Sequence, residues 1–111
     1  MKYEFIGWCR DEEKNQDKVW ICIHLSGSRM NPMDYNHLTW GAQGKYLTVW
    51  GRRGKKLQHK VVEAVGYDML KLINAKRSKG YALVDKTELD LVYPEFQEDL
   101  EKTAAWGLLL S

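Results

Sequence analysis

The chain has 111 residues, of which 44% are hydrophobic and 29% are charged, and its formal net charge is +2. This length suits one domain with a single core, and the longest apolar runs fall far short of the ~18 residues that a transmembrane helix needs. The first residues, MKYEFIGWCRDEEK, lack the sustained apolar stretch of a secretory signal. We therefore expect one domain over residues 1–111, no membrane segment and a cytoplasmic location.

The two cysteines, Cys9 and Cys22, are too few for a disulfide scaffold and lack the C-x-x-C spacing of a zinc site. We expect both to be free thiols. No G-x-S-x-G, H-E-x-x-H or phosphate-loop motif occurs, and the three histidines lie near no nucleophile signature. The sequence therefore predicts a protein that is not an enzyme, with no catalytic residues, no metal site and no cofactor.

Charge is distributed unevenly along the chain. Residues 45–84 contain ten lysines and arginines but only two acids, a local charge of +8, whereas residues 85–111 contain two bases and seven acids, a local charge of −5. A basic block is thus followed by an acidic tail, and each is a candidate surface for a partner of opposite charge.

The first half of the chain reads as two strands and a long loop. Residues 2–6 alternate in polarity, and in residues 18–25 the apolar Val19, Ile21 and Ile23 alternate with other side chains, which predicts a strand with one buried face. Trp20 lies on the other face, either half-buried under the following loop or free to make an aromatic contact. Residues 26–44 are rich in Gly, Ser, Asn, Pro and Asp, which predicts a loop insertion.

The second half reads as a hairpin followed by helices. Residues 46–50 and 56–62 are strand-like, and the glycines of residues 51–54 suit a tight turn between them. From about residue 63 the apolar spacing becomes helical, up to a C-cap at Gly80. Residues 81–84 suit a short strand or an extended passage. A C-terminal helix is expected from Thr87 or Pro94, with the apolar residues 106–110 packed back on the core.

This order of elements predicts an α+β fold. We expect a small antiparallel sheet with one main helix packed on one face and an appended C-terminal helix, both helices lying on the same face. The basic residues of the main helix either keep that helix soluble or extend a basic surface. They are Lys71, Lys76, Arg77 and Lys79.

The pattern W-G-x-x-G-K occurs twice, at residues 40–45 and 50–55. The first copy lies in the turn-rich loop, where we expect Trp40 to act as a lid on the sheet. The second contains Arg52 and Arg53 and leads into a lysine-rich strand. We interpret the repeat as shared hairpin chemistry and take the second copy as the candidate site.

Over residues 17–81 the chain resembles a WGR domain, a module of DNA-damage-activated poly(ADP-ribose) polymerases and of stand-alone bacterial and phage proteins. The matching features are Lys18-Val19-Trp20, the corner Leu47-Thr48-Val49-Trp50-Gly51-Arg52-Arg53-Gly54-Lys55, Gln58, the helical stripe Val65, Met69, Leu72, Ile73 and Lys76, and the ending Gly80-Tyr81. The chain departs from the family in having Leu57 where a glycine is usual, and in a shorter path from corner to helix. The insertion at 26–44 and the acidic helical extension at 85–111 have no counterpart.

The resemblance implies DNA binding, in which Trp50 and Arg52 touch the sugar-phosphate end of a break. The remaining candidate residues are the basic side chains of the hairpin, namely Lys45, Arg53, Lys55, Lys56 and Lys60. Such a cluster binds phosphates and makes affinity depend on salt. We expect binding to duplex ends or nicks without regard to base sequence.

The same residues also have purely structural interpretations. Trp50 suits a core position at a strand end, the lysines suit a solvated face, and Arg52 suits a brace for the corner. The alternative function is a protein-protein interaction module that uses the basic hairpin face or the acidic tail. In that case the tail could also fold over the hairpin and screen its charge.

Overall fold

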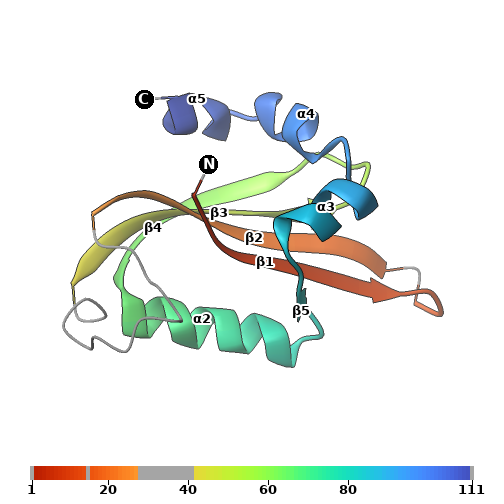
Figure 1. Cartoon of the computed structure of the whole chain (residues 1–111), viewed down its shortest axis with the longest axis horizontal. Coiled ribbons are helices and arrows are strands. Elements are labelled where there is room, and N and C mark those ends of the chain that lie inside the picture. The colour runs from red at the N-terminus through yellow and green to blue at the C-terminus, as the bar shows by residue number, and fades with distance from the viewer. Residues whose placement is uncertain (1, 15, 28–41, 111) are drawn as a thin grey trace.

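The computed structural model describes residues 2–14, 16–27 and 42–110. Within them, five strands form one antiparallel sheet in the order β4-β3-β2-β1-β5 (Figure 1). The strands are β1 (Lys2–Asp11), β2 (Gln16–Gly27), β3 (Gln43–Arg52), β4 (Gln58–Val65) and β5 (Ala82–Leu83). The predicted α+β fold with an antiparallel sheet is confirmed. The predictions for Trp40 and for residues 28–41 of the insertion lie outside the described residues.

The strands are longer than the alternation predicted. β1 continues beyond residue 6 because Trp8 and Cys9 pair with Val19 and Lys18 of β2. Residues 26–27 and 43–44, assigned to the loop from their composition, extend β2 and β3, where Gly27 pairs with Gly44 and Ser26 pairs with Lys45. Of the two alternatives for residues 81–84, the strand is correct, since β5 pairs with β1.

Helix α2 (Gly66–Ser78) covers one face of the sheet, as predicted. Its buried residues Met69 and Ile73 lie four apart and pack on side chains from three strands. Those side chains are Phe5, Trp20, Cys22 and Tyr46. The helix ends just before Gly80, whose φ of 102° is easily reached only by glycine.

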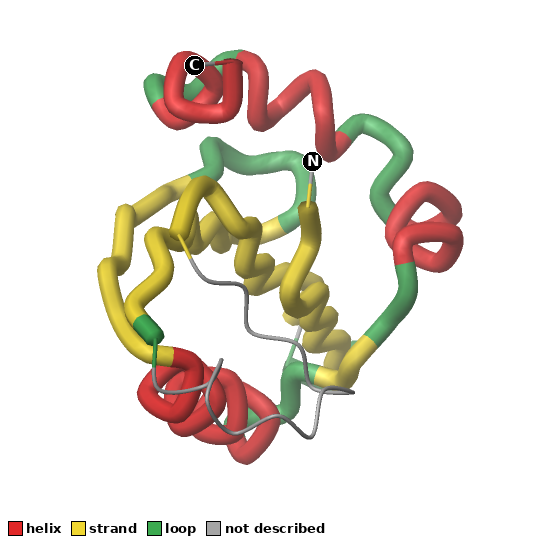
Figure 2. The backbone as a smooth tube through the Cα atoms, turned by 60° about the vertical axis from the view of Figure 1, so that its left-hand side comes forward, coloured by secondary structure: helices red, strands yellow, loops and turns green. Residues whose placement is uncertain are grey.

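The C-terminal segment forms three short helices instead of the single helix predicted, and they lie on the opposite face from α2 (Figures 1 and 2). They are α3 (Lys86–Val92), α4 (Phe96–Glu101) and α5 (Ala105–Leu110). Asp85 caps α3 by accepting the Glu88 N–H at 2.7 Å, and Pro94 disfavours helical backbone at Tyr93. The expectation that both helical parts share one face is therefore wrong.

Because helices cover both faces, β2 is buried on both. Val19, Ile21 and Ile23 lie in the core under α3 to α5, whereas Trp20 and Cys22 lie in the core under α2. The predicted strand with one buried face is thus wrong, and Trp20 is only 3% exposed. The alternation in β2 separates two apolar faces of different composition, not an apolar face from a solvated one.

Cys9 and Cys22 are buried free thiols, as predicted. Burial is the main cause that raises the pKa of Cys22 to about 12, so this thiol is held in its unreactive protonated form. In the described part of the chain, no helix is long and apolar enough to span a membrane.

Candidate nucleic-acid interface

The W-G-R corner is formed where β3 runs into the turn before β4. Trp50 pairs with Trp20 of β2, and Arg52 pairs with Lys18 of β2, which lies two residues before Trp20. Side chains two residues apart on a strand share a face, so all four project to the side that α2 covers. The turn itself contains Gly54, with a φ of 83° and open space where a side chain would lie.

Trp50 is half-buried and lines a hollow of about 170 Å³ between the sheet and the second half of α2. The other lining residues are Trp20, Thr48, Lys60, Val62, Leu72 and Lys76. We call this the tryptophan hollow. Among the residues that the structure describes, its lining contains two indoles, two lysines and no carboxylate.

Cations from separate elements meet around this hollow. Lys76 Nζ of α2 lies 5.7 Å from the centroid of the Trp20 ring, and Lys18 Nζ lies 5.7 Å from that of Tyr81. Burial, followed by repulsion from Lys79 and Lys18, lowers the pKa of Lys76. The charges are therefore close enough to oppose one another in the free protein.

A second hollow, of about 320 Å³, adjoins the corner at the start of β2. Lys14, Lys18 and Arg52 line it together with Gln16 and Asp17. The basic surface thus continues from the tryptophan hollow, past Arg52, to the turn between β1 and β2.

Arg53 has a structural role. Its guanidinium lies 2.7 Å from the Asp17 carboxylate and donates to the Val92 carbonyl at the end of α3. Asp17 also accepts the Trp8 indole N–H at 2.8 Å. Arg53 therefore acts as a brace that ties β2 and the corner to the C-terminal helices.

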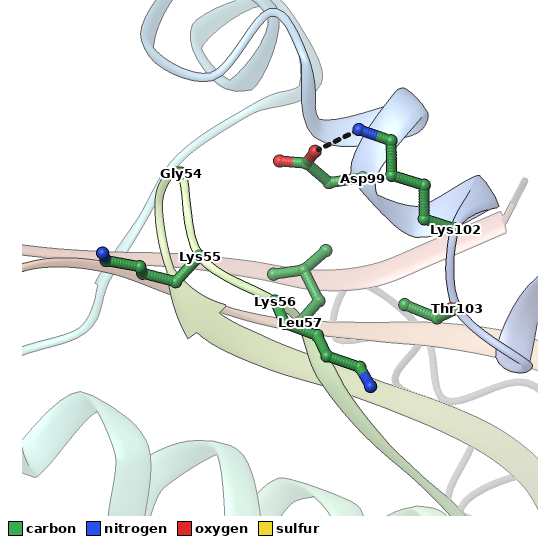
Figure 3. A pocket seen from close by; sticks show the side chains of 7 residues that line it. All are labelled: Gly54, Lys55, Lys56, Leu57, Asp99, Lys102 and Thr103. Atoms are coloured by element: carbon green, nitrogen blue, oxygen red, sulfur yellow. Dashed lines mark ion pairs between the residues drawn. The ribbon is translucent and has the colours of Figure 1, made fainter.

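Lys55 and Lys56 lie in the turn and line a cavity of about 350 Å³ against α4 (Figure 3). Their side chains point in opposite directions, and Lys102 reaches toward Asp99 at 3.8 Å. Asp99 also accepts the Tyr93 hydroxyl at 2.5 Å. The acidic tail thus lies beside the turn, but this carboxylate contacts Tyr93 and Lys102 of its own segment.

The departure at Leu57 has a structural reason. Leu57 is 3% exposed, points toward α4 and belongs to the core formed by the C-terminal helices (Figure 3). A glycine at this position would leave part of that core unfilled. Leu57 and the C-terminal extension therefore form parts of one packed core.

Lys45 is separated from the other predicted residues. It pairs with Ser26 and Glu63 near the start of β3, whereas Trp50 lies near the end of the strand. The two positions are five residues apart, an odd number, which puts them on opposite faces of the sheet.

The structure therefore divides the seven predicted residues. Trp50 and Lys60 share the tryptophan hollow, and Arg52 adjoins it. The sequence did not assign Lys18 and Lys76 to the site. Two features of the sequence could have pointed to them. Lys76 lies in the apolar stripe of α2, which faces the sheet, and Lys18 lies two residues before Trp20 and thus on the same face of its strand. Among the described residues, no three His, Cys, Asp or Glu side chains are grouped to hold a metal ion.

Comparisons of the chain with protein-family models, with curated proteins and with solved structures gave no match. The resemblance to WGR domains consequently depends on the quoted residues and motifs alone.

Proposed function

We propose that this protein is a non-catalytic nucleic-acid-binding module that contacts the sugar-phosphate backbone or strand ends of DNA through its W-G-R corner. The observation that carries the proposal is the tryptophan hollow, in which half-buried Trp50 lies with lysines from β4 and α2 and, among the described residues, no carboxylate. An aromatic ring among cations suits a ligand that alternates apolar rings with anionic phosphates.

Two further features support this function. The resemblance to WGR domains implies DNA contact by Trp50 and Arg52, the residues that project toward the face with the hollow. Moreover, the cations come from β2, β3, β4 and α2, so the fold brings together charges that are distant in the sequence. Binding is expected to be independent of base sequence, because phosphate contacts carry no sequence information.

A matched pair of lysine variants on one hairpin tests the proposal. Fluorescence anisotropy is measured with blunt duplex, nicked duplex and single strands between about 50 and 200 mM salt. We expect salt-sensitive binding by the wild type, and for Lys60→Ala we expect weaker binding to the best ligand and a salt slope smaller by about 0.7 to 0.9. Lys45→Ala is the control, because it removes the same charge at the far end of the hairpin on the other face.

Two results would contradict the proposal. If the wild type binds none of these nucleic acids in a salt-sensitive way, the nucleic-acid function is wrong and the protein-interaction alternative takes its place. If Lys45→Ala weakens binding as much as Lys60→Ala, the basic charge matters but the tryptophan hollow is not the site.

A further inference from the structure

Basic side chains lie on both sides of Trp50 along the sheet. Along β3, Thr48, Trp50 and Arg52 project to the same face at intervals of about 7 Å. Lys60 pairs with Thr48, and Lys18 pairs with Arg52. Trp50 is therefore flanked on one side by Lys60 and on the other by Arg52 and Lys18.

The ring of Trp50 is recessed. It is half-buried in a hollow that α2 borders through Leu72 and Lys76 and that β4 borders through Val62. The bases inside an intact duplex have both faces covered by stacked neighbours, and a terminal base pair is too wide and rigid to enter a recessed hollow of this size. An unpaired base has a free face and a flexible backbone that can enter such a space.

The hollow offers stacking and charge but little that could read a base. Its hydroxyl group, that of Thr48, already donates to the Lys60 carbonyl at 3.0 Å. Among the described residues, the other polar side-chain groups of the lining are the two ammonium groups and the indole N–H groups of the tryptophans. These features suit any base whose flanking phosphates reach the lysines.

An anion bound near these lysines would also stabilise their positive charges. Lys76 lies over Trp20, and both Lys18 and Lys79 are near enough to disfavour its charge. A phosphate placed among these side chains would offset their mutual repulsion.

We propose that the tryptophan hollow binds one unpaired nucleotide of a single-stranded segment, with its base on Trp50 and its flanking phosphates on Lys60 with Lys76 and on Lys18 with Arg52. The proposal rests on the proposed function and narrows its ligand from nucleic acid in general to single strands, overhangs or gaps. DNA and RNA share this chemistry, so both belong in the test.

The test compares ligands with the wild-type protein. Oligothymidylate and oligouridylate are each expected to bind at least about tenfold more tightly than a blunt duplex of equal strand length. The ratio between the two single strands identifies DNA or RNA as the better ligand. An oligothymidylate whose central residues are abasic keeps every phosphate but removes the stacking bases, and it is expected to bind at least about fivefold more weakly than the intact strand.

Variants give a second, independent measurement. Trp50→Ala is expected to reduce the preference for single strands over duplex to less than about threefold, whereas Trp50→Phe, which keeps a ring, retains most of it. Trp106→Leu is the matched control, since Trp106 is also half-buried but packs on the core of the opposite face.

Three results would overturn the inference. Equal or tighter binding of blunt duplex would show that the site takes paired DNA, which would leave the proposed function intact. Unchanged affinity for the abasic strand would show that no base stacks. Failure to bind any nucleic acid would reject both the inference and the proposed function.

Discussion

Arg52 and Arg53 are adjacent in the chain but serve different parts of the molecule. Arg53 pairs with Asp17 and donates to the Val92 carbonyl, whereas Arg52 lines a basic hollow with Lys14 and Lys18. Arg52 is the last residue of β3 and Arg53 is the first residue of the turn, where its contacts with Asp17 and Val92 place it on the side of the C-terminal helices.

This difference predicts that alanine substitution of Arg53 mainly lowers stability, whereas alanine substitution of Arg52 mainly weakens nucleic-acid binding. Arg53→Ala should lower the free energy of unfolding by about 1 to 2 kcal/mol, because it leaves the half-buried Asp17 with one partner fewer. Arg52→Ala should weaken nucleic-acid binding more than Arg53→Ala does, because Arg52 lines the basic hollow. Urea unfolding and anisotropy on both variants measure the two effects. An unchanged free energy of unfolding for Arg53→Ala would mean that Arg53 is not a brace.

At this scale, part of the arrangement of the candidate site follows from the sequence. Alternation along β3 is enough to place Trp50 and Arg52 on one face of the strand. The same alternation places Lys45 on the opposite face, so its separation from Trp50 could be predicted once the bounds of β3 are known. The approach of Lys76 to Trp20 was not predictable, because it depends on how α2 crosses the sheet.

Among the elements, the C-terminal helices differ most from expectation. The sequence pattern predicted one helix in this segment, but Asp85 caps the start of α3, Pro94 follows its end, and the apolar residues of the segment close a second core. The signals for the division are present in the sequence as a cap three residues before Glu88 and a proline after Tyr93. The choice of face could not be predicted, because both faces of β2 are apolar enough to be buried.

The docking of these helices predicts how stability varies with pH. Burial and the hydrogen bond to Asp99 raise the pKa of Tyr93 above its ordinary value of 10. The unfolded chain therefore loses this proton first, so the contribution is complete below pH about 10 and is lost as the pH rises toward the folded-state pKa. Tyr3 adds to this effect, since burial and the Asp90 charge raise its pKa to about 12.

The measurement is urea unfolding at a series of alkaline pH values. The wild type should lose up to about 1.4 kcal/mol per pH unit for each proton involved, and Tyr93→Phe should lose less. Tyr67→Phe is the control, because Tyr67 is exposed on α2. A Tyr93→Phe profile parallel to that of the wild type would show that this hydroxyl does not secure the helices.

Across the whole molecule, the small net charge of +2 hides a division between the two sides of the sheet. Lys18, Arg52, Lys60 and Lys76 gather on the α2 side, while the acidic tail forms the helices of the other side. The tail lies near the turn that carries Lys55 and Lys56, but the lining of the tryptophan hollow contains none of its residues. The fold therefore leaves the basic hollow unscreened by the tail.

The central claim is that the tryptophan hollow is the nucleic-acid site, and the most direct test is a ¹H–¹⁵N NMR titration of the intact protein with oligothymidylate. The indole N–H signals of Trp50 and Trp20 should shift together with the backbone signals of residues 18, 52, 60 and 76, whereas those of Trp8 and Trp106 should stay in place. Shifts confined to α3, α4 and α5, or no shifts at all, would contradict the claim.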